Sequence, residues 1–382
     1  MQNAYRQFGI IINSILGNHT LPDIEYDWDC LTELFKKQSI TPILNYAVTH
    51  SDNITNQPSQ NNKESLYKTN LQLVSRQVNQ LRELDLLKKK FEENGIDCIF
   101  LKGSVIRSRY SNPLFRTMGD IDFLYKSEHH KLLKQVMLDN GYGGYEEGRK
   151  NDTYRKSKNI VVEAHRQLVP SDSCFYEWCN KVWDRSILSN GMNHIHEMKI
   201  EDEIIFSVIH MAIHFLEGGI GARFLCDIYV YKDIVCDRDY LNRELESIGL
   251  LEFYKEMSGL VDYWFSSETT EELFYDKMID FIMDGGVFGT CENAQVLATE
   301  KGGFRYLMSY WFPSFREMCS LYPWLHGKAI LLPLAWIKRA FTAVSGGKSV
   351  KASIKTAQKA DPEREKEIRE LYNDYGLHMT LR

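Results

Sequence analysis

Two short stretches within residues 96–124 constrain this chain more than any other part of its sequence. The first is an apolar run, residues 96–101, that leads into Lys102, Gly103 and Ser104. A strand that ends in a glycine turn lets the backbone approach a phosphate closely. A helix that follows would point its amide groups and the positive end of its dipole at that phosphate. The run and its turn therefore predict a phosphate-binding site, to which Lys102 would add a positive charge.

The second stretch carries two carboxylates on a predicted strand over residues 120–125. Asp120 and Asp122 point to the same face of that strand, because side chains alternate along it, while Ile121 points to the other face. Proteins usually hold magnesium with one or two carboxylates, together with phosphate oxygens and water. The pair therefore predicts a divalent metal site that faces the phosphate-binding turn. Each motif alone is common, so the interpretation rests on their order and separation.

A third carboxylate is expected if Asp120 and Asp122 serve phosphoryl chemistry with metal ions. Such reactions use one ion to hold the triphosphate and another to lower the pKa of the attacking hydroxyl. Glu163 is the candidate, because it follows the hydrophobic residues 160–162, where a carboxylate is costly unless it is paired or bound to metal. The alternative is an edge-strand glutamate that faces water. The two aspartates upstream favour the metal-binding role.

The elements predicted around these residues describe a small mixed sheet backed by helices. They are, in order, a helix over residues 63–94, strands over 96–101 and 120–125, a helix over 128–140, and strands over 154–156 and 160–165. Gly95 is expected to end the first helix. From residue 171 onward, the periodicity predicts helices almost throughout.

This order divides the chain into four predicted regions. They are an N-terminal helical region (1–95), a core with the sheet (96–170), a helical substrate-side domain (171–300) and an aromatic helical C-terminal segment with a polar tail (301–382). The tail begins with four lysines between residues 348 and 359. Such a charged run is typical of a solvated helix or tail, and the alternative is a site for an anionic substrate or a membrane surface.

The composition is that of an ordinary soluble globular protein, with 43% hydrophobic and 26% charged residues. The net charge of −6 and the lack of a basic, aromatic-interleaved groove argue against nucleic acid as a partner. Eight dispersed cysteines without a Cys-x-x-Cys pair fit a reducing cytoplasm. The most apolar late run, residues 329–337, is interrupted by Pro333 and is shorter than the roughly 20 residues that span a bilayer. We therefore expect a cytoplasmic protein without a transmembrane segment.

Residues in both stretches, and others further along, resemble the uncharacterised nucleotidyltransferase family of bacteria within the DNA polymerase beta-like superfamily. The superfamily pattern is Gly-Ser or Gly-Gly, a following Asp-x-Asp, and a third acidic residue on a later strand. The resemblance spans most of the chain from about residue 66 and is carried by residues 102–104, Tyr110, Arg116, residues 119–122, 162–165 and 210–214, Arg223, Asp227, and residues 312–314 and 331–333. Lys102 departs from the superfamily, in which many members have an apolar residue there, but it matches the related family.

The resemblance implies an α+β fold with a small mixed-sheet, polymerase beta-like nucleotidyltransferase core between extensive helical layers. It implies a metal-dependent enzyme that moves a nucleoside monophosphate from an NTP to a hydroxyl or similar group and releases pyrophosphate. The residues expected to be catalytic and to bind magnesium or manganese are Asp120, Asp122 and Glu163. Those expected to bind the nucleotide phosphates are Lys102, Gly103, Ser104 and Arg116.

The acceptor stays open between a small molecule, a peptide and a protein, and so does the choice of NTP. A second hypothesis is a catalytically silent nucleotide-binding or protein-interaction module on the same fold. The presence of all three carboxylates counts against this module.

Several side chains have two possible roles. The residues that are candidates for lining a substrate cleft are His165, His210, His214, Arg223 and Asp227. His210 and His214 lie at i and i+4, a spacing that can bind metal, but no Glu stands between them as in a metalloprotease helix, and packing is the alternative. Arg223 could meet a triphosphate or bond to an aspartate of the helical layer. Arg116 could contact a phosphate or brace its own loop.

Overall fold

A seven-stranded mixed sheet is formed by the part of the chain that the computed structural model describes, residues 1–147, 151–266, 273–287, 318, 325, 328–336 and 362–377. The strand order is β3-β4-β5-β2-β1-β7-β6. The strands are β1 (Cys98–Phe100), β2 (Ile121–Tyr125), β3 (Gly144–Glu147), β4 (Asn151–Ser157), β5 (Ile160–His165), β6 (Ile187–Leu188) and β7 (Ile195–Glu197).

The sheet is mixed because strands distant in sequence pair in parallel. β2 runs parallel to β5, and β1 runs parallel to β7. The other pairs, β1 with β2, β3 with β4, β4 with β5 and β6 with β7, are antiparallel. The parallel pairing of β2 and β5 places Glu163, in the middle of β5, directly opposite Asp122 of β2.

Helices make up most of the rest of the described chain. The α-helices are α1 (Gln2–Leu16), α2 (Trp28–Lys37), α3 (Thr41–His50), α4 (Gln60–Asn94), α5 (Gly103–Ile106), α6 (His130–Asp139), α7 (Tyr176–Asn180), α8 (Val182–Arg185), α9 (Ile200–Glu217), α10 (Ala222–Lys232), α11 (Arg238–Ser247), α12 (Leu251–Trp264), α13 (Leu273–Asp284) and α19 (Pro362–Asp374). The 3₁₀ turns among the described residues are η1 (Arg107–Arg109), η2 (Pro113–Phe115), η3 (Ser127–His129) and η5 (Ala329–Leu331).

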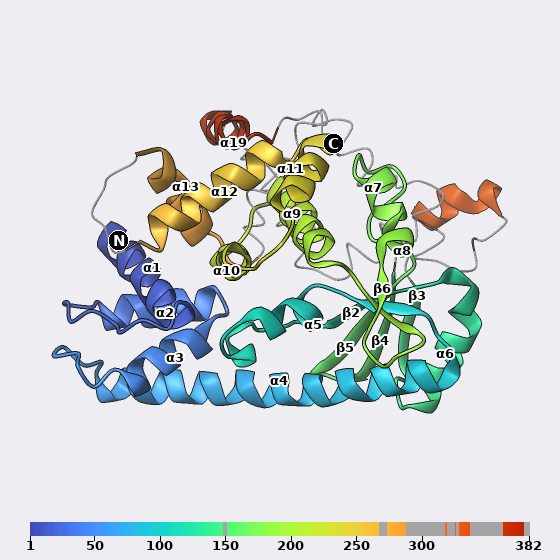
Figure 1. The fold of residues 1–382 in the computed structure, drawn as a ribbon, viewed down its shortest axis with the longest axis horizontal. Helices are drawn as coiled ribbons and strands as arrows, with labels where there is room; N and C mark the ends of the chain where they lie inside the picture. Colours follow the sequence, from blue (N-terminus) through green and yellow to red (C-terminus); the bar gives the residue numbers. More distant parts are fainter. Residues whose placement is uncertain are drawn as a thin grey trace.

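Helix α4 is the longest described helix and links the two ends of the molecule. It runs along the lower edge in Figure 1, past α3 and then past the sheet, while α9 to α13 lie on the opposite side. Its N-terminus is capped by Ser59, whose Oγ accepts a hydrogen bond from the Asn62 amide at 3.2 Å. It ends at Gly95, whose φ of 68° is a left-handed conformation that disfavours a side chain. The predicted end of this helix is therefore confirmed.

The two faces of the sheet pack into different hydrophobic cores. Phe123 of β2 packs against Phe91 of α4, with ring centroids 4.9 Å apart. Leu124, the next residue, belongs instead to the core formed with the helical layers. Because side chains alternate along a strand, Asp122 shares the face of Leu124 and is turned toward the helical layers.

The predicted fold class, an α+β protein with a small mixed sheet between helical layers, is confirmed. The expectation of helices almost throughout after residue 171 is wrong for the two short strands β6 and β7. Before that residue, the structure also contains β3, a strand that the sequence did not predict. β6 and β7 have two and three residues, too few to show a periodic pattern. β7 is a strand because it pairs with β1, where Cys98 lies opposite Ile195, and tertiary pairing of this kind overrides local preference.

Some expectations fall on residues that the structure does not describe. The lysine-rich stretch 348–359 and residues 312–314 lie outside the described ranges, as does most of the aromatic C-terminal segment. Within the described ranges, no helix combines the length and the apolar character needed to cross a membrane.

Candidate active site

Two carboxylates meet on neighbouring strands on the face of the sheet turned toward the helical layers. In the parallel register of β2 and β5, Asp122 lies directly opposite Glu163, and Leu124 lies opposite His165. Asp122, Glu163 and His165 each offer one ligand atom, and these atoms all lie within 4.8 Å of one another. The structure therefore brings together two of the three predicted carboxylates and adds an imidazole.

Asp122 is the most strongly held of these carboxylates. Its Oδ1 accepts a hydrogen bond from Lys102 Nζ at 2.8 Å and another from His165 Nε2, also at 2.8 Å. Burial opposes ionisation of Asp122, but Lys102 and His165 outweigh it and hold the pKa of this carboxyl well below its usual range. Asp122 is therefore a buried anion that keeps its charge at all ordinary pH values.

The pKa of Asp120 is shifted in the opposite direction from that of Asp122. Burial, followed by the negative charges of Asp122 and Glu163, raises the pKa of Asp120 to about 7. Lys102 and Arg223 act in the other direction but do not compensate. The negative charges of the three carboxylates thus act on one another here, and strongly perturbed pKa values of this kind cluster at functional sites.

The backbone of the turn after β1 is strained at Lys102. Lys102 has a φ of 50° and a ψ of −129°, a conformation that few residues other than glycine adopt. A Cβ on Gly103 would lie 2.8 Å from Met118 Cγ, so only glycine fits there without a shift of Met118. The Ser104 amide donates to the Leu101 carbonyl at 3.1 Å, and α5 is a single turn. Ser104 Oγ is buried and has no hydrogen-bond partner in the described part of the chain.

Arg116 is bonded to Asp227 in the helical layer. Its Nε donates to Oδ1 at 2.6 Å and its Nη2 donates to Oδ2 at 2.7 Å. Tyr110 also donates to Asp227 Oδ1, at 2.6 Å, and all three side chains are buried. Of the two roles considered for Arg116, the bracing role agrees with these contacts. Arg223 Nη1 donates to the Thr117 carbonyl at 3.3 Å.

The hydrogen bond from Tyr110 to Asp227 is a feature that the sequence did not predict. The two residues lie 117 positions apart. No local pattern in the sequence signals a bond at that separation.

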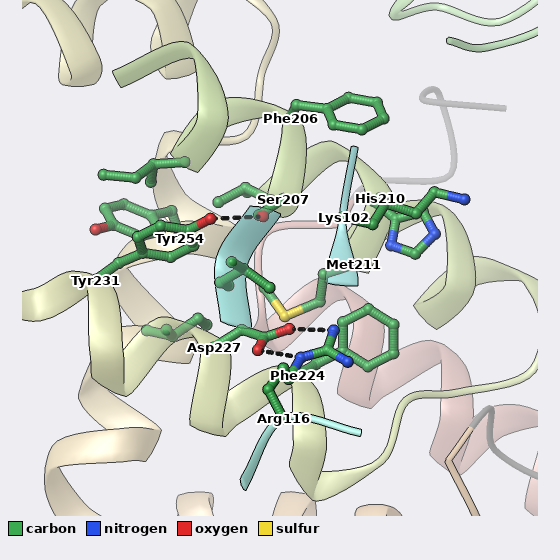
Figure 2. Close-up of a pocket in the computed structure, with 14 residues that line it drawn as sticks. Lys102, Arg116, Phe206, Ser207, His210, Met211, Phe224, Asp227, Tyr231 and Tyr254 are labelled. Atoms are coloured by element: carbon green, nitrogen blue, oxygen red, sulfur yellow. Dashed lines mark hydrogen bonds and ion pairs between the residues drawn. The ribbon is translucent and has the colours of Figure 1, made fainter. Parts of the chain in front are cut away.

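A small cavity connects Lys102 with the helical layer. It has a volume of about 30 Å³, and Arg116, His210, Phe224 and Asp227 help to line it (Figure 2). A space of that size holds about one water molecule. Burial, with Lys102 and His214 nearby, keeps the pKa of His210 well below its usual range, so its imidazole is neutral.

The other histidine of the pair contacts His210 itself. His214 Nε2 lies 3.0 Å from His210 Nε2. Of the five cleft candidates, His210 and Asp227 line the cavity beside Lys102, whereas His165 lies at the carboxylates.

A family model described as an uncharacterised nucleotidyltransferase matches residues 25–266, which is more than half of the 382 residues. This range begins before residue 66 and contains every predicted site residue, but it ends before the late motifs at 312–314 and 331–333. No curated protein and no solved structure matches the chain significantly. From the match and the site geometry we conclude that the chain belongs to this uncharacterised nucleotidyltransferase family.

Proposed function

We propose that the protein moves a nucleoside monophosphate from an NTP to a hydroxyl or similar group of an acceptor, with magnesium or manganese, and releases pyrophosphate. The observation that carries this proposal is the register of β2 and β5, which sets Asp122 opposite Glu163. General nucleotidyl transfer follows from membership of the family. The need for a metal ion, the NTP as donor and the kind of acceptor are what we add to that activity as a proposal.

The donor atoms of the site fit a hard divalent cation. Asp120, Asp122 and Glu163 would hold it, because carboxylate oxygens are the ligands that magnesium and manganese prefer. When bound, the ion neutralises phosphate charge and lowers the pKa of the attacking hydroxyl. His165 either donates to Asp122, as it does in this structure, or joins the ligands.

The chain's own residues would then position the triphosphate. Lys102, already 2.8 Å from Asp122, supplies an ammonium group that can reach phosphate oxygens at the same site. Ser104 supplies a buried hydroxyl without a partner in the described chain, and Gly103 lets the backbone come close. Their contribution is positioning and charge neutralisation.

The proposed reaction balances as a displacement at the α-phosphorus. The acceptor oxygen forms a bond to that phosphorus, and the bond from it to the bridging oxygen of the β-phosphate breaks. Pyrophosphate leaves with the electron pair of that bond. The proton of the hydroxyl passes to a carboxylate of the site or to water.

Transfer of label from α-³²P-labelled NTPs tests this proposal. Each NTP is incubated with the protein, Mg²⁺ or Mn²⁺, and a small-molecule fraction of cell lysate. We expect the double variant Asp120→Asn and Asp122→Asn to lose at least about 100-fold in transfer, since metal coordination supplies several kcal/mol and each 1.4 kcal/mol is tenfold. The control is Asp139→Asn at the exposed end of α6, which should keep full transfer.

Two outcomes would contradict the proposal. Transfer that survives the double substitution would contradict the assignment of Asp120 and Asp122 as metal ligands. Tight binding of Mg²⁺-NTP without transfer to any acceptor, in wild type, would support the silent binding module instead.

A further inference from the structure

His165 is the last residue of β5 and lies beside two carboxylates of the site. Its backbone lies opposite Leu124 of β2 and Asn151 of β4, so the sheet holds it from both sides. Its side chain is only 3% exposed, whereas the side chain of Glu163 is 30% exposed. The imidazole is therefore carried by a rigid part of the fold, and solvent reaches Glu163 far more readily than it reaches His165.

The contact with Asp122 determines which ring nitrogen of His165 carries a proton. His165 Nε2 lies 2.8 Å from Asp122 Oδ1. Because Asp122 is ionised, its oxygens only accept hydrogen bonds, so Nε2 is the donor. A ring nitrogen that carries a proton has no lone pair to give to a metal ion. In this arrangement, His165 bonds to a carboxylate of the site through the same nitrogen that would otherwise bind the ion.

The other ring nitrogen makes a change to metal binding unfavourable. His165 Nδ1 is buried and has no hydrogen-bond partner in the described part of the chain. An imidazole that binds a metal usually donates its other N–H to a carboxylate, a carbonyl or water. If Nε2 bound the ion, the N–H at Nδ1 would lack a protein acceptor there, and Asp122 would lose a donor.

The two donors to Asp122 use the same carboxylate oxygen. Lys102 Nζ and His165 Nε2 both donate to Oδ1, and no other described residue donates to Oδ2. A carboxylate oxygen has about two lone-pair sites, so the two donors occupy those of Oδ1. Asp122 is thus held by one oxygen, and its other oxygen is left for a cation on the face that it shares with Glu163.

We propose that His165 is a positioning residue, which donates the hydrogen bond that orients Asp122 for the metal ion and does not coordinate the ion itself. This inference rests on the proposed function. The protein ligands are then carboxylate oxygens alone, from Asp120, Asp122 and Glu163. Carboxylates suit Mg²⁺ and Mn²⁺, whereas an imidazole ligand would add a preference for ions such as Ni²⁺.

Binding of Mn²⁺ to the full chain without nucleotide tests the positioning role, with the EPR signal of free Mn²⁺ as the readout. His165→Ala removes the donor and should weaken Mn²⁺ binding by about 10–100-fold. His165→Gln supplies an amide N–H that can still donate to Asp122, so it should stay within about threefold of wild type. The control is His19→Ala, at an exposed histidine after α1, which should leave Mn²⁺ binding unchanged.

Two further measurements separate positioning from coordination, and both remain possible if His165→Ala does not fold. Pulsed EPR of Mn²⁺ bound to wild type should show no directly bonded nitrogen that disappears in His165→Gln. Ni²⁺ binding, measured by displacement of Mn²⁺ from the site, should change in His165→Gln by the same factor as Mn²⁺ binding.

Three results would overturn the proposal. The first is a nitrogen bonded to Mn²⁺ in wild type and absent in His165→Gln. The second is a loss of Ni²⁺ binding in His165→Gln that exceeds the loss of Mn²⁺ binding by about tenfold or more. The third is Mn²⁺ binding like that of wild type in a folded His165→Ala, or binding in His165→Gln as weak as in His165→Ala.

Asp122→Asn separates failure of this inference from failure of the proposed function. If Asp122→Asn abolishes Mn²⁺ binding and folded His165→Ala keeps it, the positioning role alone is wrong. If wild type binds no Mn²⁺, or if Asp122→Asn binds it as wild type does, the metal site of the proposed function is wrong and the positioning role falls with it.

Discussion

Lys102 Nζ lies 2.8 Å from Asp122 Oδ1, and the backbone of Lys102 adopts a φ of 50° at that turn. A strained backbone angle at a non-glycine residue persists only where the surrounding structure imposes it, and such angles gather at functional sites. The side chain of Lys102 therefore meets the Asp122 carboxylate from a backbone conformation that glycine would adopt more easily.

Two substitutions at Lys102 separate its charge from its backbone strain. Lys102→Met keeps the strain and Lys102→Gly relieves it, while both remove the ammonium group. We expect Lys102→Gly to be more stable than Lys102→Met by about 1 kcal/mol in urea unfolding. Both should weaken Mg²⁺-NTP binding by about tenfold or more, because a charged hydrogen bond to phosphate is lost. Equal stability of the two variants would show that the turn is not strained.

Asp120 gives the metal-free protein a defined pH dependence. Its pKa is raised from 3.8 to about 7 in the folded protein, so the folded state binds a proton that the unfolded state has released between these values. The free energy of unfolding contributed by Asp120 therefore falls as pH rises through this window. Asp120→Asn should remove this fall and raise the melting temperature at about pH 8, in EDTA, above that of wild type.

Metal binding should reverse the effect of pH at the same carboxylate. Because the ligands must be ionised, Mg²⁺ or Mn²⁺ should raise the melting temperature of wild type more at about pH 8 than at about pH 6. The same measurement on Asp120→Asn should show a smaller response. A metal response that is independent of both pH and Asp120 would contradict the role of Asp120 as a ligand.

The ion pair of Arg116 and Asp227 is expected to hold the structure together rather than to bind nucleotide. Asp227→Asn leaves a buried guanidinium without a counter-charge, so it should destabilise the protein by about 3–5 kcal/mol. The double variant Arg116→Met with Asp227→Leu should recover most of that loss. Urea unfolding measures both effects. If the folded double variant binds Mg²⁺-NTP much more weakly than wild type, Arg116 contacts the phosphates after all.

Gly103 should be coupled energetically to Met118. A Cβ at residue 103 would lie 2.8 Å from Met118 Cγ, so Gly103→Ala should cost about 1–3 kcal/mol by overpacking. The same substitution in a Met118→Ala background should cost much less, because the opposing side chain is gone. A double-mutant cycle in urea measures this coupling. Additive effects would show that the space at Gly103 is not limited by Met118.

Features that depend on near neighbours in the chain were readable from the sequence. The glycine at 95 predicted the end of α4, which its φ of 68° confirms. The predicted strand over 120–125 begins one residue later, so Asp122 lies on β2 but Asp120 lies in a bend directly before it. The strand that leads into the Lys-Gly-Ser turn was readable for the same reason. Each of these depends on backbone geometry over a few residues.

Features that depend on distant partners were decided only by the tertiary structure. The sequence proposed Glu163 as a third carboxylate, but the parallel register of β2 and β5 is what sets it opposite Asp122. Likewise, no local pattern assigns Asp227 to Arg116, which lies 111 positions away, or makes β7 a partner of β1. Strand pairing and buried ion pairs depend on how whole elements pack, and packing brings together residues whose separation along the chain carries no signal.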